Sequence, residues 1–422
     1  MHIYTRPIDS DATPTRALRL LGARAHERGL PPPAALTGEW FGNSAVLVPS
    51  ARIAPAPTGA EFTPLDLPAA GTGGPEPVGG GWIGYLGYGR TDPGSHVQPR
   101  RLPDGAWGWT DHVLRLDPDG QWWFESLTGP DPALEAELTE LLTGPDPLPV
   151  EVRAGAVESP DAELHRKAVR RCVAEIAAGE IFQANICSRF AMPFDGDVLE
   201  IFAAGSERFG PARAAYVAGD WGAVASLSPE LFLARHGDVV RSRPIKGTTP
   251  RRGPADAANA DVLRSSVKDI AENVMIVDMA RNDLGRVAEI GTVEVPRLLA
   301  VEPHPGVWHL VSEVRAQLPA GLPNSRLLEA TFPPASVTGA PKSRALEIIA
   351  ELEAQPRDVY CGAVGMVSPA AGMELNVAIR TVEQSAGTLH LGVGGGITAD
   401  SDPDREWQEC LTKAAPVLSL LR

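Results

Sequence analysis

Residues 360–397 read YCGAVGMVSPAAGMELNVAIRTVEQSAGTLHLGVGGGI, and this stretch decides the fold class. Apolar and β-branched residues recur between the turn sequences SPAAG and QSAG, which predicts a meander of three strands: Tyr360–Val367, Met373–Glu383 and Leu389–Ile397. One predicted helix opens at Pro341 before the meander, and Ser401-Asp402-Pro403-Asp404 caps another after it. Helices and hairpin-linked strands in mixed order indicate an α+β fold.

Outward from this stretch, the chain divides into three regions. Residues 1–128 hold most of the tryptophans and several glycine-rich turns, a texture typical of antiparallel strands. Residues 129–158 are predicted to be a connector, because GPDP and GPDPLP bracket a short acidic helix. Residues 159–422 open at Ser159-Pro160-Asp161, which has the residue types of a helix N-terminus.

Within the third region, the spacing of apolar residues predicts further elements: strands at Ile181–Phe190 and Val307–Leu318, and one continuous helix at about Ala258–Ala280.

The chain is acidic. Its 422 residues include 53 Asp and Glu against 38 Lys and Arg, for a formal net charge of −15. This disfavours nucleic acid and anionic membranes as partners, because phosphates are bound by clustered Lys and Arg. No signal peptide is recognised, and no apolar run approaches the roughly 18 residues of a spanning helix. The four cysteines are far apart and lack zinc spacing, so a reduced, cytoplasmic protein is expected.

Two pairs of carboxylates lie on separate predicted helices. Asp269 and Glu272 are three residues apart, as are Glu406 and Glu409, so each pair shares one helical face. A solvated charged face is the simpler interpretation. The apolar run that follows Glu272 indicates a largely buried helix, however, and buried carboxylates need a partner. Carboxylates from two helices, together with water, suit octahedral Mg²⁺.

A short basic segment, RPIKGTTPR at residues 243–251, stands out in the acidic chain. A surface loop with a solvated lysine is the alternative that composition favours. Lys246 between Ile245 and Gly247 also suits a lysine nucleophile, which must be neutral to attack and therefore needs desolvation or a nearby cation.

Four weaker patterns have competing explanations. Gly392–Gly396 lets backbone N–H groups approach an anion, or forms a bulged strand end. PPASVTGAPKS at 333–343 suits an anion at a helix N-terminus, or a plain capped loop. Ser265-Ser266-Val267-Lys268 matches the S-x-x-K pattern of serine acyl-enzymes, but no K-T-G or S-D-N follows, and chance is the better explanation. His309 lies in strand-like sequence and is as easily a core histidine.

In their order along the chain, these segments resemble the chorismate-utilising enzymes, a family that includes anthranilate, aminodeoxychorismate, isochorismate and salicylate synthases. The resemblance covers about residues 160–420 and is carried by AGEIFQANICSRF, SLSPELF, RPIKGTTPR, AENVMIVDMARNDLGRV, FPPASVTGAPKSRALEII and GVGGGITADSDPDREWQECLTKA. It implies the family fold, two large antiparallel β-sheets packed face to face with helices outside and an active site between them.

The resemblance also implies roles for individual residues. Glu230 is expected to be the general acid that helps the 4-hydroxyl of chorismate to leave, and Lys246 the nucleophile. Four carboxylates are expected around Mg²⁺, which holds the ring carboxylate: Glu272 and Glu409 as ligands, with Asp269 and Glu406 close by. The rest of the substrate is expected to contact Ser336, His309, Tyr360, Arg380, Lys413 and the backbone of Gly394, Gly395 and Gly396.

Two positions distinguish members of the family. Water-adding isochorismate and salicylate synthases carry a lysine base where this chain has Gln183, so water addition is poorly supported. Anthranilate synthases resemble P-I-A-G-T, whereas P-I-K-G-T, with Lys246, looks like the aminodeoxychorismate synthases. We therefore expect chorismate and ammonia to give 4-amino-4-deoxychorismate, for p-aminobenzoate and folate. Anthranilate formation, as by anthranilate synthase component I, is the alternative.

The source of ammonia is expected outside this chain. No G-x-C-x-G-like nucleophile elbow with a partnering His is visible in the sequence. A separate glutamine amidotransferase subunit is therefore the expected partner.

Overall fold

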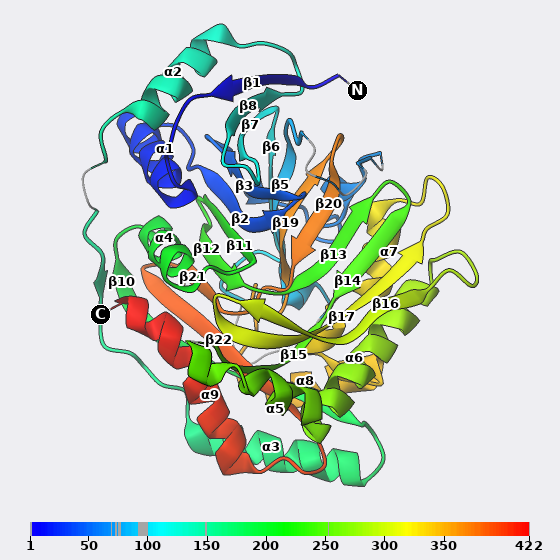
Figure 1. The fold of residues 1–422 in the computed structure, drawn as a ribbon. Helices are drawn as coiled ribbons and strands as arrows, with labels where there is room; N and C mark the ends of the chain where they lie inside the picture. The colour runs from blue at the N-terminus through cyan, green and yellow to red at the C-terminus, as the bar shows by residue number, and fades with distance from the viewer. Residues whose placement is uncertain are drawn as a thin grey trace.

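A computed structural model describes residues 2–68, 70–71, 74, 77–91, 100–147, 150–251 and 253–421. Their strands form two large sheets, with helices around them (Figure 1). Neighbouring strands pair antiparallel in both sheets, as β10 with β22 and β5 with β6 do. The predicted α+β fold of two packed sheets is confirmed.

The larger sheet has twelve strands within the described residues. Their order across the sheet is β1 (Tyr4–Ile8), β8 (Trp122–Ser126), β7 (His112–Leu116), β3 (Asn43–Val48), β2 (Ala34–Trp40), β11 (Arg213–Gly219), β12 (Gly222–Ser228), β21 (Thr381–Ser385), β22 (Thr388–Ile397), β10 (Gln183–Asp195) and β18 (Gly339–Ala340), with β9 (Arg153–Ala154) paired to β10.

The smaller sheet has ten strands in the same part of the chain. Their order is β15 (Ile245–Arg251), β17 (Gly306–Gln317), β14 (Val239–Arg243), β13 (Leu231–His236), β20 (Gly372–Asn376), β19 (Ala363–Ser368), β5 (Gly81–Leu86), β6 (Gly105–Thr110) and β4 (Ala54–Pro55), with β16 (Glu294–His304) paired to β17.

Strands from both ends of the chain share both sheets. In the larger sheet β2 pairs with β11, and in the smaller sheet β5 pairs with β19. The division into residues 1–128, a connector at 129–158 and residues 159–422 stays a prediction about sequence regions. Residues 148 and 149 of the connector lie outside the described residues.

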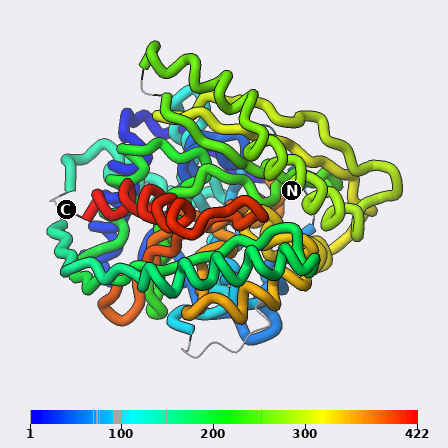
Figure 2. The backbone as a smooth tube through the Cα atoms, turned by 90° about the horizontal axis from the view of Figure 1, so that it is seen from below, coloured from blue at the N-terminus to red at the C-terminus, as the bar shows by residue number. Residues whose placement is uncertain are grey.

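The helices pack on the outside of the sheets. Those on the larger sheet are α1 (Pro14–Arg28), α3 (Ala162–Ala177), α4 (Val198–Phe209), α8 (Lys342–Leu352) and α9 (Pro403–Leu418), with α2 (Pro132–Thr143) against α1. Those on the smaller sheet are α5 (Asn259–Ser265) and α6 (Val267–Gly285), with α7 (Asn324–Thr331) against α6. Short 3₁₀ turns are η1 (Thr63–Leu65), η2 (Tyr88–Thr91), η3 (Pro254–Asp256), η4 (Ala335–Val337) and η5 (Ser419–Leu421). Figure 2 shows α3 and α9 side by side, seen from below.

An apolar layer joins the two sheets. Side chains from β2, β3, β11 and β12 of the larger sheet meet side chains from β5, β6 and β19 of the smaller one, among them Leu36, Trp40, Tyr85 and Met366. Each such side chain stabilises the fold by about 1.5–3 kcal/mol when it leaves water. This layer therefore fixes the sheets face to face.

The predicted three-strand meander is wrong at its centre. The expected strand Met373–Glu383 is two strands, β20 in the smaller sheet and β21 in the larger. The chain crosses between the sheets at residues 377–380, where Arg380 has a φ of 51°. Val377 and Ala378 are buried in this crossing, so the apolar pattern runs through it unbroken and carries no sign of the change of sheet.

The predicted continuous helix at Ala258–Ala280 is also broken. α5 ends at Ser265 and α6 begins at Val267, because Ser266 is extended between them and its hydroxyl accepts a hydrogen bond from Asp269 N at 3.2 Å. The S-x-x-K segment is thus a helix cap. The Ser265 hydroxyl donates to the backbone carbonyls of Asp261 and Val262, an arrangement that gives the acyl-enzyme interpretation no support.

Two further expectations concern membrane-spanning segments and cysteines. Among the described residues, no helix combines the length and apolar character needed to cross a bilayer. The four cysteines are free and buried.

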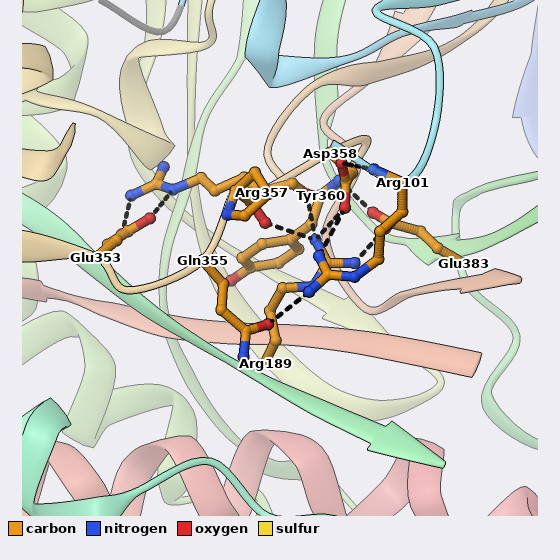
Figure 3. A network of polar contacts seen from close by, with 9 residues as sticks. Arg101, Arg189, Glu353, Gln355, Arg357, Asp358, Tyr360 and Glu383 are labelled. Carbon is orange, nitrogen blue, oxygen red and sulfur yellow. Dashed lines mark hydrogen bonds and ion pairs between the residues drawn. The ribbon is translucent and has the colours of Figure 1, made fainter. Parts of the chain in front are cut away.

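A buried ion network ties the loop before β19 to the larger sheet (Figure 3). Arg189 on β10 pairs with Glu383 on β21 and donates to the carbonyls of Pro356 and Arg357 at 3.1 and 2.6 Å. Its Nη1 also lies 3.4 Å from Asp358 Oδ2. A single arginine thereby satisfies two carboxylates and two carbonyls that have no access to water.

Replacing Arg189 by Met should therefore be costly. We expect the Arg189→Met protein to lose about 3–5 kcal/mol in the free energy of unfolding, because buried Glu383 loses its counter-ion, whereas Asp358 keeps its ion pair with Arg101 at 3.1 Å. Urea unfolding measures this. The double variant with Glu383→Gln should lose less than Arg189→Met alone. As a control, Arg153→Met removes an exposed pair with Glu151 and should change stability by less than about 0.5 kcal/mol. A loss below about 1 kcal/mol for Arg189→Met would contradict this role.

Candidate functional site

The glycine run of β22 forms one wall of the candidate site. A Cβ added to Gly392 would lie 2.3 Å from ring atoms of Tyr360, and one added to Gly396 would lie 2.4 Å from Gln183 Nε2. Both side chains rest against the strand backbone only because these positions have no side chain. Gly392–Gly396 pair with β10 in unbroken register, so the alternative of a bulged strand end is wrong, and the approach of backbone N–H groups to an anion stays a prediction.

Three of the four predicted carboxylates lie against this strand. A Cβ added to Gly395 would lie 3.2 Å from Glu406 Oε2 and 3.6 Å from Glu409 Oε1, and both glutamates belong to α9. The corresponding position on Gly396 lies 3.6 Å from Glu272 Oε2 on α6. The fourth carboxylate, Asp269, lies one turn before Glu272 and contacts Gly247 of β15.

Three lysines face these carboxylates. Lys246 Nζ lies 3.8 Å from Glu272 Oε2, and Lys413 Nζ lies 2.7 Å from Glu409 Oε1 while donating to Gly394 O at 2.8 Å. Lys268 lies 3.8 Å from Glu272 Oε1 and 3.9 Å from Glu406 Oε1. Burial acts to raise the pKa of Glu409, but Lys413 outweighs it and the pKa is lowered.

Sequence reasoning missed Lys268. It stands in the first turn of α6, where the positive end of the helix dipole disfavours a cation. Two local signals could have marked it: that mismatch, and the four-residue spacing that places Lys268 and Glu272 on one face of α6.

The bulge in β15 explains the glycine of the segment P-I-K-G-T. The pairing with β17 shifts register between Lys246 and Thr248, and Gly247 has a φ of 82°. A Cβ on Gly247 would lie 3.1 Å from Asp269 Cβ. Glycine therefore permits both the backbone turn and the close approach of α6, which brings Lys246 beside Glu272.

Glu230 is a buried acid in the loop between β12 and β13. Burial raises its pKa to about 7, and Ser336, Lys246 and the backbone N–H of Ile245 only partly offset this. Glu230 and Ser336 line one cavity, with apolar side chains of α6 around them. At neutral pH the carboxyl is therefore close to half protonated, which is the state a general acid needs.

His309 and Arg380 form a second group. His309 Nδ1 lies 2.9 Å from Thr248 Oγ1, and burial together with nearby Arg380 lowers the pKa of His309 to about 3, so the ring is neutral. Arg380 lies at the crossing between the sheets and is exposed. Within the described residues no ion pair holds its guanidinium, so it is free to bind an anion.

Tyr360 is positioned by the ion network of Figure 3. Its backbone N–H donates to Glu383 Oε1 at 2.6 Å, and its buried ring lies over Gly392. The contacts thus place the predicted residues in linked groups: Glu230, Lys246 and Ser336; the carboxylates with the lysines at Gly394–Gly396; His309 with Arg380; and Tyr360 on β22.

The oxygen donors suit a divalent cation that needs few protein ligands. No group of three or more His, Cys, Asp or Glu in the described part of the chain is arranged to hold a metal ion. Mg²⁺, however, is commonly held by one or two carboxylates, with water and substrate completing its octahedron. Glu272 and Glu409 approach neighbouring glycines from two helices and fit that role.

A buried acid beside a lysine, together with an arginine that has no carboxylate partner in the described part of the chain, is typical of enzyme sites. The family profile of chorismate binding enzymes matches residues 55–419. The chain belongs to this family.

Known relatives carry several names within the family. Aminodeoxychorismate synthase component 1 of Klebsiella aerogenes is 39% identical over 82% of this chain and 78% of its own length. Anthranilate synthase component 1 of Neisseria meningitidis serogroup C is 40% identical over 61% of this chain and 54% of its own. The menaquinone-specific isochorismate synthase of Escherichia coli matches in structure with a TM-score of 0.76, at 20% identity, over all of this chain and 94% of its own, which shows the shared fold.

Glu230 should make stability depend on pH. Its folded-state pKa, about 7, lies above the ordinary value of 4.5, so its contribution is complete below about pH 4.5 and is lost as pH rises through about 7. Glu230→Gln removes this loss. As pH rises from about 5 to about 8, the free energy of unfolding of the variant, measured in urea, should increase by about 2–4 kcal/mol relative to that of the parent. A difference between the two proteins that stays constant over this range would show that Glu230 has an ordinary pKa.

Proposed function

We propose that the chain converts chorismate and ammonia into 4-amino-4-deoxychorismate, as its relatives' name, aminodeoxychorismate synthase component 1, states for them. Relatives named for anthranilate synthesis match at similar identity, so identity does not choose between the two reactions. One observation carries the choice: a lysine, Lys246, stands at the acidic site beside Glu230 and Glu272.

The reaction proceeds through two displacements. The Lys246 amine forms a bond to C2 of chorismate, both double bonds of the ring diene shift, and the C4–O bond breaks as Glu230 gives its proton to the departing hydroxyl, which leaves as water. Ammonia then bonds to C4, both double bonds shift back, and the C2–N bond breaks. The proton that ammonia sheds restores Glu230. One difficult direct displacement becomes two easier ones.

Lys246 must be neutral when it attacks. Its ammonium lies 3.8 Å from Glu272, and only 15% of its side chain is exposed, so the group is shielded from water while it is paired to a carboxylate. Glu272 and Glu409 would hold Mg²⁺, which would supply positive charge for the ring carboxylate of the substrate.

The remaining residues position the substrate. Arg380, which has no carboxylate partner within the described residues, binds one substrate carboxylate, and Lys413 with the neighbouring backbone of Gly394–Gly396 binds the other. Ser336, neutral His309 and Tyr360 line the ring. Asp269 and Glu406 flank the metal ligands.

Two competing reactions lose support at named positions. Addition of ammonia at C2, which leads to anthranilate, is blocked by the lysine amine that stands there. Addition of water needs a base, and Gln183, whose side chain packs on Gly396, carries an amide that cannot accept a proton at neutral pH.

Ammonia comes from a second component. The designation "component 1" of the relatives implies such a partner for them, and we propose a glutamine amidotransferase subunit for this chain.

Product identification tests the proposal. Incubation with chorismate, an ammonium salt and Mg²⁺ should give 4-amino-4-deoxychorismate by mass spectrometry and NMR, and Lys246→Ala should lower its rate by roughly 10²-fold or more. Lys167→Ala, at an exposed lysine on α3, is the control and should leave the rate unchanged. Anthranilate as the main product would overturn the proposed function. If Lys246→Ala forms 4-amino-4-deoxychorismate at the parent's rate, Lys246 is not the nucleophile, but the proposed overall reaction stands.

A further inference from the structure

The proposed reaction gives no role to Lys268, whose ammonium lies among the carboxylates of the site. It belongs to the S-x-x-K segment and stands in the first turn of α6, two residues after the cap Ser266. A lysine there opposes the helix dipole, although it also pairs with Glu272 four residues further along the same helix. Burial acts to lower the pKa of Lys268, but four carboxylates raise it, Glu272 and Glu406 most strongly.

The contacts of Lys268 span the two helices that carry the proposed metal ligands. Its ammonium lies 3.8 Å from Glu272 on α6 and 3.9 Å from Glu406 on α9. A divalent cation held by Glu272 and Glu409 would neutralise the same group of carboxylates. The Lys268 ammonium and the metal would therefore neutralise the same carboxylates.

The three lysines differ in how firmly they are held. Lys413 donates a hydrogen bond to Gly394 O and is paired to Glu409 on its own helix. Lys246 is 85% shielded within β15. Lys268 has 57% of its side chain exposed, and among the described residues charge alone holds its ammonium, since both carboxylates lie beyond hydrogen-bond length. Of the three lysines, Lys268 is therefore the one whose ammonium can move away from the carboxylates most easily.

We propose that Lys268 is an internal counter-ion that competes with the metal and so keeps the affinity of the free enzyme for Mg²⁺ low. In the metal-free protein the ammonium holds Glu272 and Glu406 together. When Mg²⁺ binds, the ammonium moves out into solvent, and the metal must overcome its attraction to the carboxylates. This inference rests on the metal site of the proposed function.

Removing the charge at residue 268 tests the competition without a turnover assay. Equilibrium dialysis, with the bound metal quantified, gives the dissociation constant for Mg²⁺ in the absence of substrate. Two ion pairs near 4 Å in a partly exposed site are lost, so we expect Lys268→Gln to bind Mg²⁺ about tenfold more tightly than the parent protein. Rising salt should narrow that difference, since exposed charges are screened.

Two control variants and a check of folding accompany this measurement. Lys268→Arg keeps the charge and should bind Mg²⁺ within about twofold of the parent. Lys167→Gln removes an exposed lysine elsewhere and should match the parent. Circular dichroism checks that each variant is folded.

Equal or weaker binding by Lys268→Gln would overturn the inference. No Mg²⁺ binding by any of the four proteins would overturn it together with the proposed metal site. The product assay is independent of both results. If 4-amino-4-deoxychorismate forms while Lys268→Gln binds Mg²⁺ no more tightly, this inference fails and the proposed function stands.

Discussion

A glycine-rich segment of β22, inside the larger sheet, is the constraint on which the site depends. Four of the five residues from Gly392 to Gly396 are glycines, and the Tyr360 ring, the Gln183 amide and the carboxylates of α6 and α9 lie against them. A single Cβ on Gly392 would meet the Tyr360 ring at 2.3 Å. The larger sheet thus forms one wall of the site, while the smaller sheet contributes Lys246 from β15 and His309 from β17. The packing of sheet on sheet decides their distance from that wall.

Charge within the site differs from charge over the whole chain. The net charge of −15 disfavours polyanions as partners, yet two acidic residues of the proposed metal site, Glu272 and Glu406, are buried. Lys246, Lys268 and Lys413 already oppose those carboxylates in the absence of a metal. Together with Arg380 they allow a small dianion to bind inside an acidic protein.

The sequence predicts those features that local patterns determine. Capped helices, the strands β17 and β22, and the carboxylate pairs at helical spacing follow from residues close together in the chain. The change of sheet at residues 377–380 does not, because buried residues on both sides leave the apolar pattern unbroken. Nor does the pairing of Arg189 with Glu383, since 194 positions separate them. The proximity of Lys268 to Glu406 likewise depends on how α6 and α9 pack, which no local pattern records.

The role of Lys246 as a nucleophile is tested most directly by the mass of the protein itself. With chorismate and Mg²⁺ but no ammonia, the second displacement cannot occur, so the adduct should accumulate. Intact mass spectrometry should then show an increase equal to chorismate less one water, and peptide mapping should place it on Lys246, with no increase in Lys246→Ala. A protein that forms 4-amino-4-deoxychorismate when ammonia is added, but shows no adduct under these conditions even after rapid quenching, would contradict covalent catalysis by this lysine.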